Sequence, residues 1–293
     1  MIKLENTVMP SADQWKAIIM GCRNPLNSWQ RSDSIKVNCD KMCCDVSDDE
    51  QEYGYNEDTC PLAINGISCD KHNMPLDDYF VGPNDYDLMK RLRNAGTDHR
   101  KFMRMITVYV DITAPLYWWK EFDAYKVGTV TNSCSTMHKI ADKEFTLEDF
   151  SHEHLLDDCR GSVAYSSMDV LQLTINALNN YREKYLKTKE EGDFTHTPKD
   201  YWWQMIQLLP SSYNQRRTVM LNYEVLANIY KSRCNHKLDE WRELCKWIEG
   251  LPYSELITGE DKIMDAINEV GNVNPISPDE LRNALKEKEN KNE

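Results

Sequence analysis

Two polar side chains interrupt an apolar stripe in the segment of residues 214–233. The sequence predicts this segment as one helix, and at about 100° per residue Asn222 and Arg233 share a face with apolar residues such as Val219 and Leu226. A guanidinium held out of water costs several kcal/mol unless an anion or a set of acceptors meets it. Arg233 therefore either has a dedicated partner or, near a helix end, meets the helix dipole and solvent. The periodicity alone leaves both interpretations open.

A second candidate is the run GTVTNSCSTMH at residues 128–138, which is dense in small hydroxyl and amide side chains. Such a loop can donate several hydrogen bonds to a phosphate or to the edge of a base. The competing interpretation, which composition favours, is a turn whose serines and threonines satisfy their own backbone. Cys134 is the one thiol in this run, and the sequence shows no base paired with it, so we do not predict it to be a nucleophile.

His99 lies in the run NAGTDHRKFMR, between a predicted helix end and a predicted strand. Its charge can switch near neutral pH, which suits acid–base chemistry. A lone histidine is more often a satisfied structural residue than a catalyst. A catalytic role for His99 therefore needs a suitable neighbour.

Caps, breakers and apolar periods define the elements that must position these side chains. Ser11 and Gln14 form a capping-box signature, and Ile106, Val108 and Val110 alternate with their neighbours as in a strand with one buried face. Prolines and glycines mark several helix ends. The predicted elements are a strand at 105–112 and helices at 11–22, 85–96, 115–128, 166–185, 197–210, 214–233 and 237–249. The chain is therefore α+β with helix dominant, and it has no visible internal repeat.

The composition limits the class of protein. The chain of 293 residues is 41% hydrophobic, which suits a packed globular protein rather than a disordered one. No basic block interrupts its net charge of -13, which argues against binding nucleic acid by charge. No apolar run approaches the ~20 residues of a membrane span. The start, MIKLENTVMP, lacks the features of a signal peptide, so we expect a cytoplasmic protein.

Residues 35–83 are acidic and rich in cysteine, and no apolar period runs through them. We expect a surface insertion within one domain of residues 1–270, followed by a C-terminal helix and charged tail at 271–293. The cysteines of a cytoplasmic chain are expected to be reduced. Six side chains of the insertion could bind zinc, but their spacing lacks the paired CxxC arrangement, so no metal is assigned to them. They are Cys39, Cys43, Cys44, Cys60, Cys69 and His72.

Three runs together resemble the flavin-dependent thymidylate synthase (ThyX) family, in order from about Asn94 to Trp247. LLPSSYNQRRTVMLNYEVLANIYKSRCNHKLDEW resembles the family's leucine–proline pair, its helix with an asparagine and its second turn ending in arginine. APLYWWKEFDAYKVGTVTNSCSTMH resembles APxFxxRQxxRHRxxSxNExSxRY, with one extra residue between Lys126 and Asn132. AGTDHRKFMR resembles GHxSPFEH. The resemblance implies a ThyX-like fold, helix-rich with a central antiparallel sheet.

The resemblance also implies roles for individual residues. Arg233 falls on the arginine that contacts and polarises the uracil ring, so it is the predicted catalytic residue. Arg216 lies in a matched run and could supply positive charge from a shifted position. The predicted substrate-binding residues are Ser133, Ser135, Arg216 and Arg233. The predicted cofactor-binding residues are His99, Lys126, Asn132, Asn222 and Asn228.

Several charged groups of the family motif are missing. Ala124, Tyr125 and Lys126 stand where the family has RHR, so a single point charge replaces a bidentate fork. Ser133 and Met137 stand where the motif has glutamate and arginine. Charge-assisted contacts to phosphate are the strong ones, and their loss motivates a second interpretation of the function.

The resemblance leads to two functions of different classes. The first is reductive methylation of dUMP or a related pyrimidine deoxynucleotide, which implies FAD, NADPH and methylenetetrahydrofolate, and a homotetramer with sites between subunits. The alternative is a catalytically altered or inactive protein of the same fold that binds a nucleotide or a flavin. A structural protein without a ligand is a third interpretation.

Overall fold

The computed structural model describes residues 2–38, 77–158, 164–192 and 195–259. The predicted C-terminal tail lies outside these ranges, as does most of the predicted insertion, including Cys39, Cys43, Cys44, Cys60, Cys69 and His72. Within the described ranges, no helix has the length and apolar character needed to cross a membrane.

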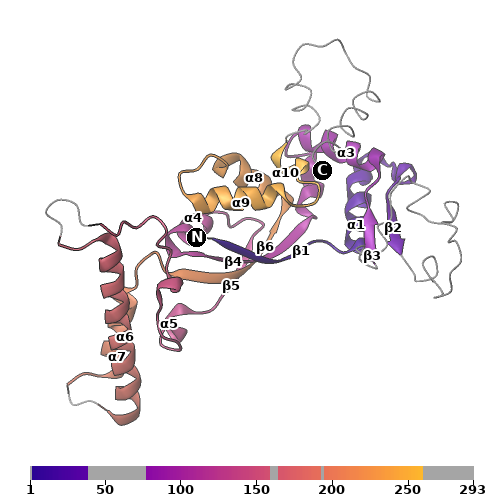
Figure 1. The fold of residues 1–293 in the computed structure, drawn as a ribbon. Helices are drawn as coiled ribbons and strands as arrows, with labels where there is room; N and C mark the ends of the chain where they lie inside the picture. The colour runs from indigo at the N-terminus through magenta and orange to yellow at the C-terminus, as the bar shows by residue number, and fades with distance from the viewer. Residues whose placement is uncertain (1, 39–76, 159–163, 193–194, 260–293) are drawn as a thin grey trace, which may run out of the picture.

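A four-stranded sheet forms the centre of the chain (Figure 1). It contains β1 (Lys3–Val8), β4 (Thr107–Pro115), β6 (Asn214–Asn222) and β5 (Val130–Ser133), in the order β1-β4-β6-β5. Every neighbouring pair of strands is antiparallel. The predicted α+β class with a central antiparallel sheet is therefore confirmed.

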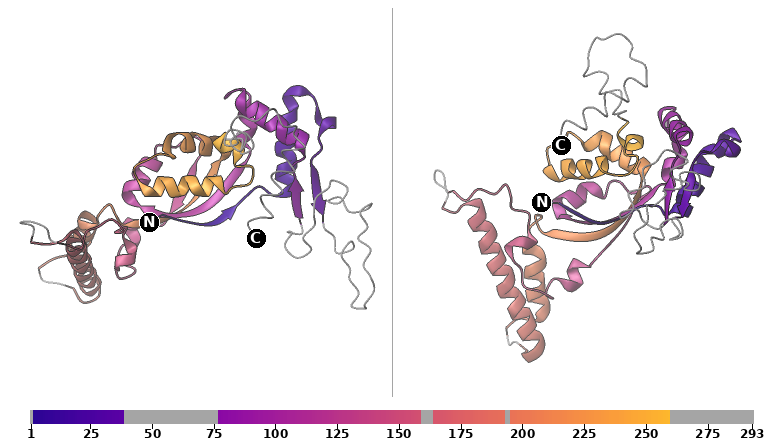
Figure 2. Two further views of the ribbon diagram at one scale, coloured as in Figure 1. Left: turned by 45° about the horizontal axis from the view of Figure 1, so that its top comes forward. Right: turned by 45° about the vertical axis from the view of Figure 1, so that its right-hand side comes forward.

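Helices cover one face of this sheet (Figure 2). They are α4 (Leu116–Phe122), α8 (Tyr223–Arg233), α9 (Asp239–Glu249) and the short α10 (Glu255–Thr258). Apolar side chains from these helices and from the sheet form one core. This layer carries Arg233 at the end of α8, so the candidate site belongs to the helical side of the sheet.

Alternate residues of the two central strands form the buried face of the sheet. Val108 and Val110 of β4 lie opposite Leu221 and Val219 of β6, and all four side chains are almost completely buried. Tyr109, between the two valines of β4, is 45% exposed and lies on the other face. The alternation that predicted this strand from sequence is confirmed.

The predicted helix at 214–233 is wrong in its first half. Residues Asn214–Asn222 form strand β6, and α8 begins only after it. Val219 and Arg233 therefore do not share a helical face, and Asn222 caps the helix instead of lying along its stripe. β6 pairs with β4 over its whole length, and this long-range pairing overrides the local pattern.

The aromatic helix after β4 is shorter than predicted. α4 ends at Phe122, and the chain turns at residues 123–129 instead of continuing as a helix to Gly128. Gly128 takes a left-handed conformation with φ 80°, which ends the turn before β5. The turn also brings Tyr125 against the end of α8.

A second, smaller core supports an arm that projects from the sheet (Figure 1). The arm consists of α6 (Ser167–Glu191) and α7 (Pro198–Leu208). Both helices were predicted from their caps and apolar periods, but α6 ends at Glu191 rather than at residue 185. Leu171, Ile175 and Met205 are buried between these helices and the chain that leads into them.

An N-terminal unit lies at the opposite end of the sheet (Figure 1). It contains α1 (Ala12–Arg23), α3 (Pro83–Asn94) and a two-stranded antiparallel sheet of β2 (Ile35–Asn38) and β3 (Asp77–Phe80). α1 begins with the predicted capping box. The two ends of the predicted insertion are therefore held side by side as paired strands.

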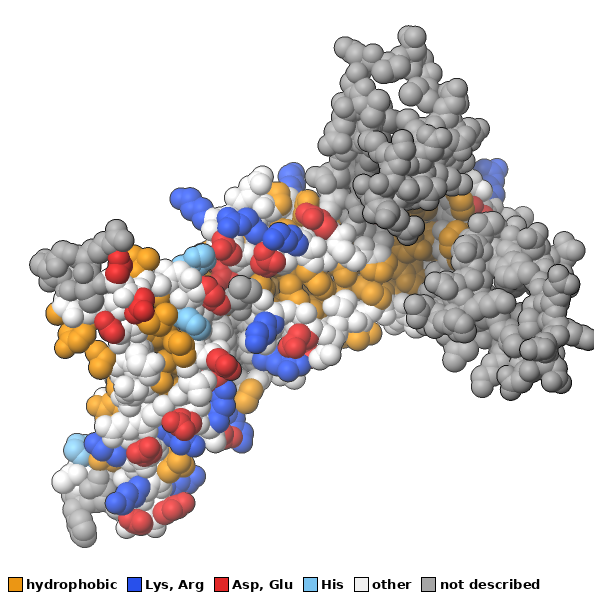
Figure 3. All heavy atoms as spheres, in the orientation of Figure 1, with side chains coloured by type: hydrophobic (Ala, Val, Ile, Leu, Met, Phe, Trp, Pro, Cys, Tyr) orange, Lys and Arg blue, Asp and Glu red, His pale blue; other side chains and the backbone are white. Residues whose placement is uncertain are grey.

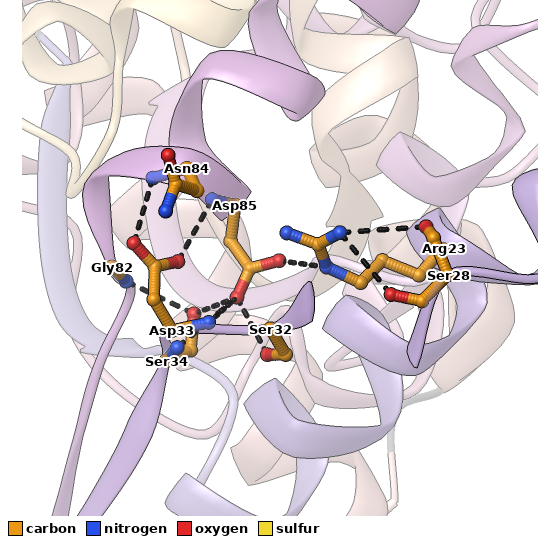
Figure 4. A network of polar contacts seen from close by, with 8 residues as sticks. All are labelled: Arg23, Ser28, Ser32, Asp33, Ser34, Gly82, Asn84 and Asp85. Carbon is orange, nitrogen blue, oxygen red and sulfur yellow. Dashed lines mark hydrogen bonds and ion pairs between the residues drawn. The ribbon is translucent and has the colours of Figure 1, made fainter. Parts of the chain in front are cut away.

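A buried ion pair joins the parts of this unit (Figure 4). Nε of Arg23 donates to Asp85, and their side chains are 5% and 1% exposed. The second oxygen of Asp85 accepts from the hydroxyls of Ser32 at 2.6 Å and Ser34 at 2.5 Å, and from the backbone N–H of Asp33 at 3.2 Å. One carboxylate thus connects α1, the segment before β2 and the start of α3.

We expect the chain to lose stability in acid because of the Asp85 carboxylate. Burial raises its pKa, but hydrogen bonds from Ser32, Ser34 and Arg23 outweigh burial and hold the pKa of Asp85 below its ordinary value of 3.8. A carboxyl with a lowered folded-state pKa stabilises the fold fully above its unfolded pKa, and the contribution is lost as the pH falls through the folded value. We expect the stability difference between the wild type and Asp85→Asn to be largest above about pH 5 and to shrink below about pH 4. Urea denaturation across this range measures it, and a constant difference would contradict the assignment.

Candidate functional site

The C-terminal end of α8 holds Arg233 among acceptors and aromatic rings. Its Nε donates to the hydroxyl of Tyr125 at 3.0 Å, and its Nη1 donates to Oε2 of Glu121 at 2.8 Å. The guanidinium carbon lies 4.6 Å from the centre of the Trp241 ring. The Arg233 side chain is 21% exposed, so it is not free in solvent. The interpretation in which this arginine has dedicated partners is confirmed. We name Glu121, Tyr125, Arg233 and Trp241 the arginine cage.

One nitrogen of the Arg233 guanidinium stays open. No acceptor among the described residues bonds to Nη2, and the atom is not buried away from solvent. The other two nitrogens already fix the plane of the group, so Nη2 points in a set direction at little further cost in side-chain entropy. Nη2 can therefore donate to a carbonyl oxygen or an anion of a ligand.

Glu121, on α4, is the acceptor that organises the arginine cage. Its Oε2 also accepts from the indole N–H of Trp241 at 2.9 Å and lies 3.7 Å from Nε2 of His236. Glu121, Trp241 and His236 are not among the site residues predicted from the sequence. The signal that could have found Glu121 is a carboxylate within the aromatic run WWKEF.

A cleft of about 280 Å³ lies beside the arginine cage, between the turn at residues 123–129 and β5. Tyr125 belongs both to the cage and to the wall of the cleft, and Lys126 brings an amino group to the wall. The hydroxyl oxygen of Thr129 is buried without a hydrogen-bond partner among the described residues. The cleft therefore offers a ring, a cation and a hydroxyl side by side. Its lining residues are Phe122, Asp123, Tyr125, Lys126, Thr129 and Thr131.

Strand β5 sends its predicted site residues to opposite faces of the sheet. Ser133 pairs with Arg217 of β6 and Asn132 pairs with Thr218, and directly paired residues share a face. Arg217 lies on the helical side, where its Nη1 is 2.8 Å from Oδ1 of Asp123. Ser133 therefore faces the side of the cleft, and Asn132 faces away from it.

Arg216 lies on the face of the sheet away from the helices. Its Nη2 donates to Oδ2 of Asp111 at 2.7 Å, and the other oxygen of Asp111 accepts from Thr218 at 2.6 Å. Hydrogen bonds from Asn6, Thr218 and Arg216 hold the pKa of Asp111 well below its usual range. Within one chain, the structure does not bring Arg216 and Arg233 together.

Ser135 stands at the start of the short helix α5 (Thr136–Lys139) and is exposed. Its hydroxyl makes no capping hydrogen bond. The interpretation in which the serines of this run bond to their own backbone therefore does not hold for Ser135. Gln215 of β6 fixes this run by donating to the carbonyl of Cys134 at 3.3 Å and to the hydroxyl of Thr136 at 3.1 Å. The Ser135 hydroxyl thus stands on an anchored segment next to β6.

Asn222 has a structural function in this chain. Its Oδ1 accepts from the backbone N–H of Val225 at 3.0 Å and caps α8, while its Nδ2 donates to the carbonyl of Gly128 at 3.5 Å. The residue is 8% exposed. A Cβ at Gly128 would lie 2.9 Å from Nδ2 of Asn222, so the turn and the cap fit together only with glycine.

Asn222→Ala is expected to lower the free energy of unfolding by about 1–2 kcal/mol, because the substitution removes a helix N-cap. Asn222→Asp keeps the capping oxygen and is expected to retain most of the stability. Asn228→Ala, an exposed position on the same helix, is the control and is expected to stay within about 0.5 kcal/mol of the wild type. Urea denaturation followed by circular dichroism measures all three. Equal losses in Asn222→Ala and Asn228→Ala would show that the cap contributes nothing.

His99 and Asn228 lie where the 3-10 helix η4 (Arg100–Arg104) packs against α8. His99 is exposed and immediately precedes η4. Nη2 of Arg100 donates to Oδ1 of Asn228 at 3.5 Å. Because Asn228 and Arg233 are five residues apart on α8, their side chains point to different sides of the helix.

The predicted cofactor-binding residues do not form one surface within a single chain. Lys126 lines the cleft, Asn132 faces away from it, and the side chain of Asn222 is used in capping. His99 and Asn228 lie by η4, on a different side of α8. These five side chains therefore do not fit FAD within one chain as described.

Comparison with known proteins finds no matching protein family and no matching curated protein. Among solved structures, the thymidylate synthase ThyX of Helicobacter pylori with FAD and dUMP aligns over 88% of this chain and 97% of its own, at 14% identity and a TM-score of 0.48. The UMP/dUMP methylase PolB of Streptomyces cacaoi bound with 5-Br dUMP aligns over 88% of this chain and 94% of its own, at 11% identity and a TM-score of 0.45. Both TM-scores are below 0.5, so these likenesses do not establish the function of this chain.

Proposed function

We propose that this chain binds a pyrimidine deoxynucleotide in the cleft beside the arginine cage, with the base against Tyr125 and Arg233. The observation that carries this proposal is the open Nη2 of Arg233, held in place by Glu121 and Tyr125. A uracil carbonyl oxygen is a suitable acceptor for Nη2, and the Tyr125 ring offers a flat apolar surface to the base. The cleft volume of about 280 Å³ is just below the range for small-molecule sites, about 300–1,000 Å³.

The phosphate of the nucleotide is expected at the open part of the cleft, next to Lys126. The Thr129 hydroxyl, which lacks a partner among the described residues, and the hydroxyl of Ser133 on the same side of the sheet can add hydrogen bonds. Asp123 is on the cleft wall, but its carboxylate pairs with Arg217 at 2.8 Å, which reduces its repulsion of an anion. Lys126 supplies a point charge rather than a fork, so phosphate recognition differs from that of the RHR motif.

For this site we propose reductive methylation of dUMP or a related pyrimidine deoxynucleotide, with FAD, NADPH and methylenetetrahydrofolate as the sequence resemblance implies. Arg233 would donate to a ring oxygen on which negative charge develops and would stabilise that charge. The proposal includes a homotetramer, since the predicted flavin-binding residues of one chain lie on separate surfaces. Residues of another copy would then complete the site.

A second candidate function is binding of a nucleotide or a flavin without methyl transfer, and Glu121 favours it. Its carboxylate lies 2.8 Å from Nη1 of Arg233 and offsets the positive charge of the guanidinium. An arginine that is already paired stabilises developing negative charge less than an unpaired one. In this account Arg233 holds the base by a hydrogen bond and does not activate it.

Purified full-length protein distinguishes the two functions. If the chain is the enzyme, it binds flavin, and reduced flavin is reoxidised when dUMP and methylenetetrahydrofolate are added, with formation of dTMP. If it is a binding protein, a nucleotide or flavin raises its melting temperature and no methylated product forms. A chain that is stabilised by neither nucleotides nor flavins contradicts both functions.

A further inference from the structure

We propose a second anion-binding site, for a phosphate-bearing small molecule, in a recess of the N-terminal unit. The recess has a volume of about 740 Å³ and lies between α1, α3 and two short 3-10 helices, η1 (Asn24–Leu26) and η2 (Trp29–Arg31). None of its lining residues belongs to the arginine cage or to the cleft. It is therefore a separate site from the proposed nucleotide site.

Arg23 is the strongest indication of a ligand in this recess. Its side chain is 5% exposed; Asp85 accepts from its Nε, and the carbonyl and hydroxyl of Ser28 accept from its Nη1 at 3.3 Å and 3.4 Å. Its Nη2 has no hydrogen-bond partner in the described part of the chain and is not buried away from solvent. Figure 4 shows this nitrogen without a dashed line. Because Arg23 lines the recess, we infer that Nη2 is a fixed donor available to a ligand there.

Two further guanidinium groups reach the recess from other elements. Arg31, on η2, is exposed, and its side chain has no ion-pair partner among the described residues. Arg91, on α3, pairs with Asp87 at 2.9 Å, but the two side chains are 67% and 61% exposed, so this pair is weak. The lining residues carry three arginines and one carboxylate, Asp87, while two further carboxylates, Asp85 and Asp33, accept from Arg23 and from the backbone of Asn84.

The donor set fits a phosphate better than a carboxylate. One arginine fork suffices for a carboxylate, whereas a phosphate has three free oxygens and up to two charges and can use several guanidinium groups. The amides of Asn27 and Asn84 add neutral donors, and Leu26 and Leu88 form an apolar wall. The recess lies within the range of about 300–1,000 Å³ of small-molecule sites, so it has room for the molecule that carries the phosphate.

Equilibrium dialysis of inorganic phosphate against the full-length chain tests this site. Arg31→Gln and Arg91→Gln are each expected to weaken binding about tenfold, as the loss of a charge-assisted hydrogen bond does. Lys187→Gln is the matched control: Lys187 is 73% exposed and pairs with Glu191 at i,i+4, as Arg91 pairs with Asp87. It makes the same change in net charge on the distant arm and is expected to leave phosphate binding unchanged.

Four results would overturn this proposal. The first is the absence of saturable phosphate binding at millimolar concentrations, and the second is equal binding by the wild type, Arg31→Gln and Arg91→Gln. The third is loss of phosphate binding in Arg233→Gln, since that would place the phosphate in the cleft. Succinate that competes more strongly than phosphate would likewise overturn the assignment to phosphate. Both substituted arginines are exposed, so the variants are expected to fold.

Discussion

Asp85→Ala is expected to lower the free energy of unfolding by about 3–5 kcal/mol, because it leaves the buried guanidinium of Arg23 without its counter-ion. The hydroxyls of Ser32 and Ser34 and the backbone N–H of Asp33 lose their acceptor in the same step. The effect is large because one carboxylate on α3 satisfies groups from two other segments of the N-terminal unit, α1 and the residues before β2 (Figure 4). Urea denaturation followed by circular dichroism measures it.

Asp87→Ala is the matched control for Asp85→Ala. Asp87 lies on the same helix and also pairs with an arginine, Arg91, but it is 61% exposed. Exposed pairs contribute at most about 1 kcal/mol. Similar losses of unfolding free energy in the two variants would mean that burial does not strengthen the Arg23–Asp85 pair.

Arg233→Gln is expected to weaken the binding of dUMP on the order of 100-fold, because it removes a fixed charge-assisted donor to the base. Arg233→Lys keeps the charge but loses the planar fork, and its affinity is expected to fall between those of the wild type and Arg233→Gln. Isothermal titration calorimetry with dUMP measures the three affinities. In Arg233→Gln, Glu121 keeps the indole N–H of Trp241 as a donor, so the fold is expected to persist.

Arg242→Gln controls for the change in net charge. Arg242 is 48% exposed on α9 and pairs with Asp239, outside the arginine cage. Its substitution is expected to leave the affinity for dUMP within about twofold of the wild type, as for other surface substitutions. If Arg233→Gln behaves in the same way as Arg242→Gln, the base does not contact the arginine cage.

Elements with local signals could be predicted from the sequence. The capping box of Ser11 and Gln14 marks the start of α1, and the alternation along β4 marks a strand with one buried face. The segment at 214–222 could not be predicted in the same way, because its few apolar residues fit a helix and a strand alike. Its pairing with β4 decides the outcome, and the contact between Asp111 and Arg216 joins residues 105 positions apart in the sequence.

Only part of the candidate site could be predicted from the sequence, because several of its contacts join residues that are far apart in the chain. Arg233 could be found as a polar residue beside buried helical positions, but its partner Glu121 lies 112 residues away, beyond any local pattern. Arg216 and Arg217 lie on opposite faces of the sheet because successive side chains of a strand alternate. This could not be predicted while the segment was taken for a helix. The resemblance places Tyr125 in a motif, whereas its contact with Arg233 follows from the early end of α4.

Photo-crosslinking with 5-iodo-dUMP shows which aromatic side chain the base contacts, because the halogenated ring reacts with aromatic side chains that it touches. If the base lies against the arginine cage, mass spectrometry will find the label on Tyr125, and Arg233→Gln will strongly reduce it at the same nucleotide concentration. Label on Tyr109, on the opposite face of the sheet, or label on Tyr125 that is undiminished in Arg233→Gln, would contradict the proposed position of the base.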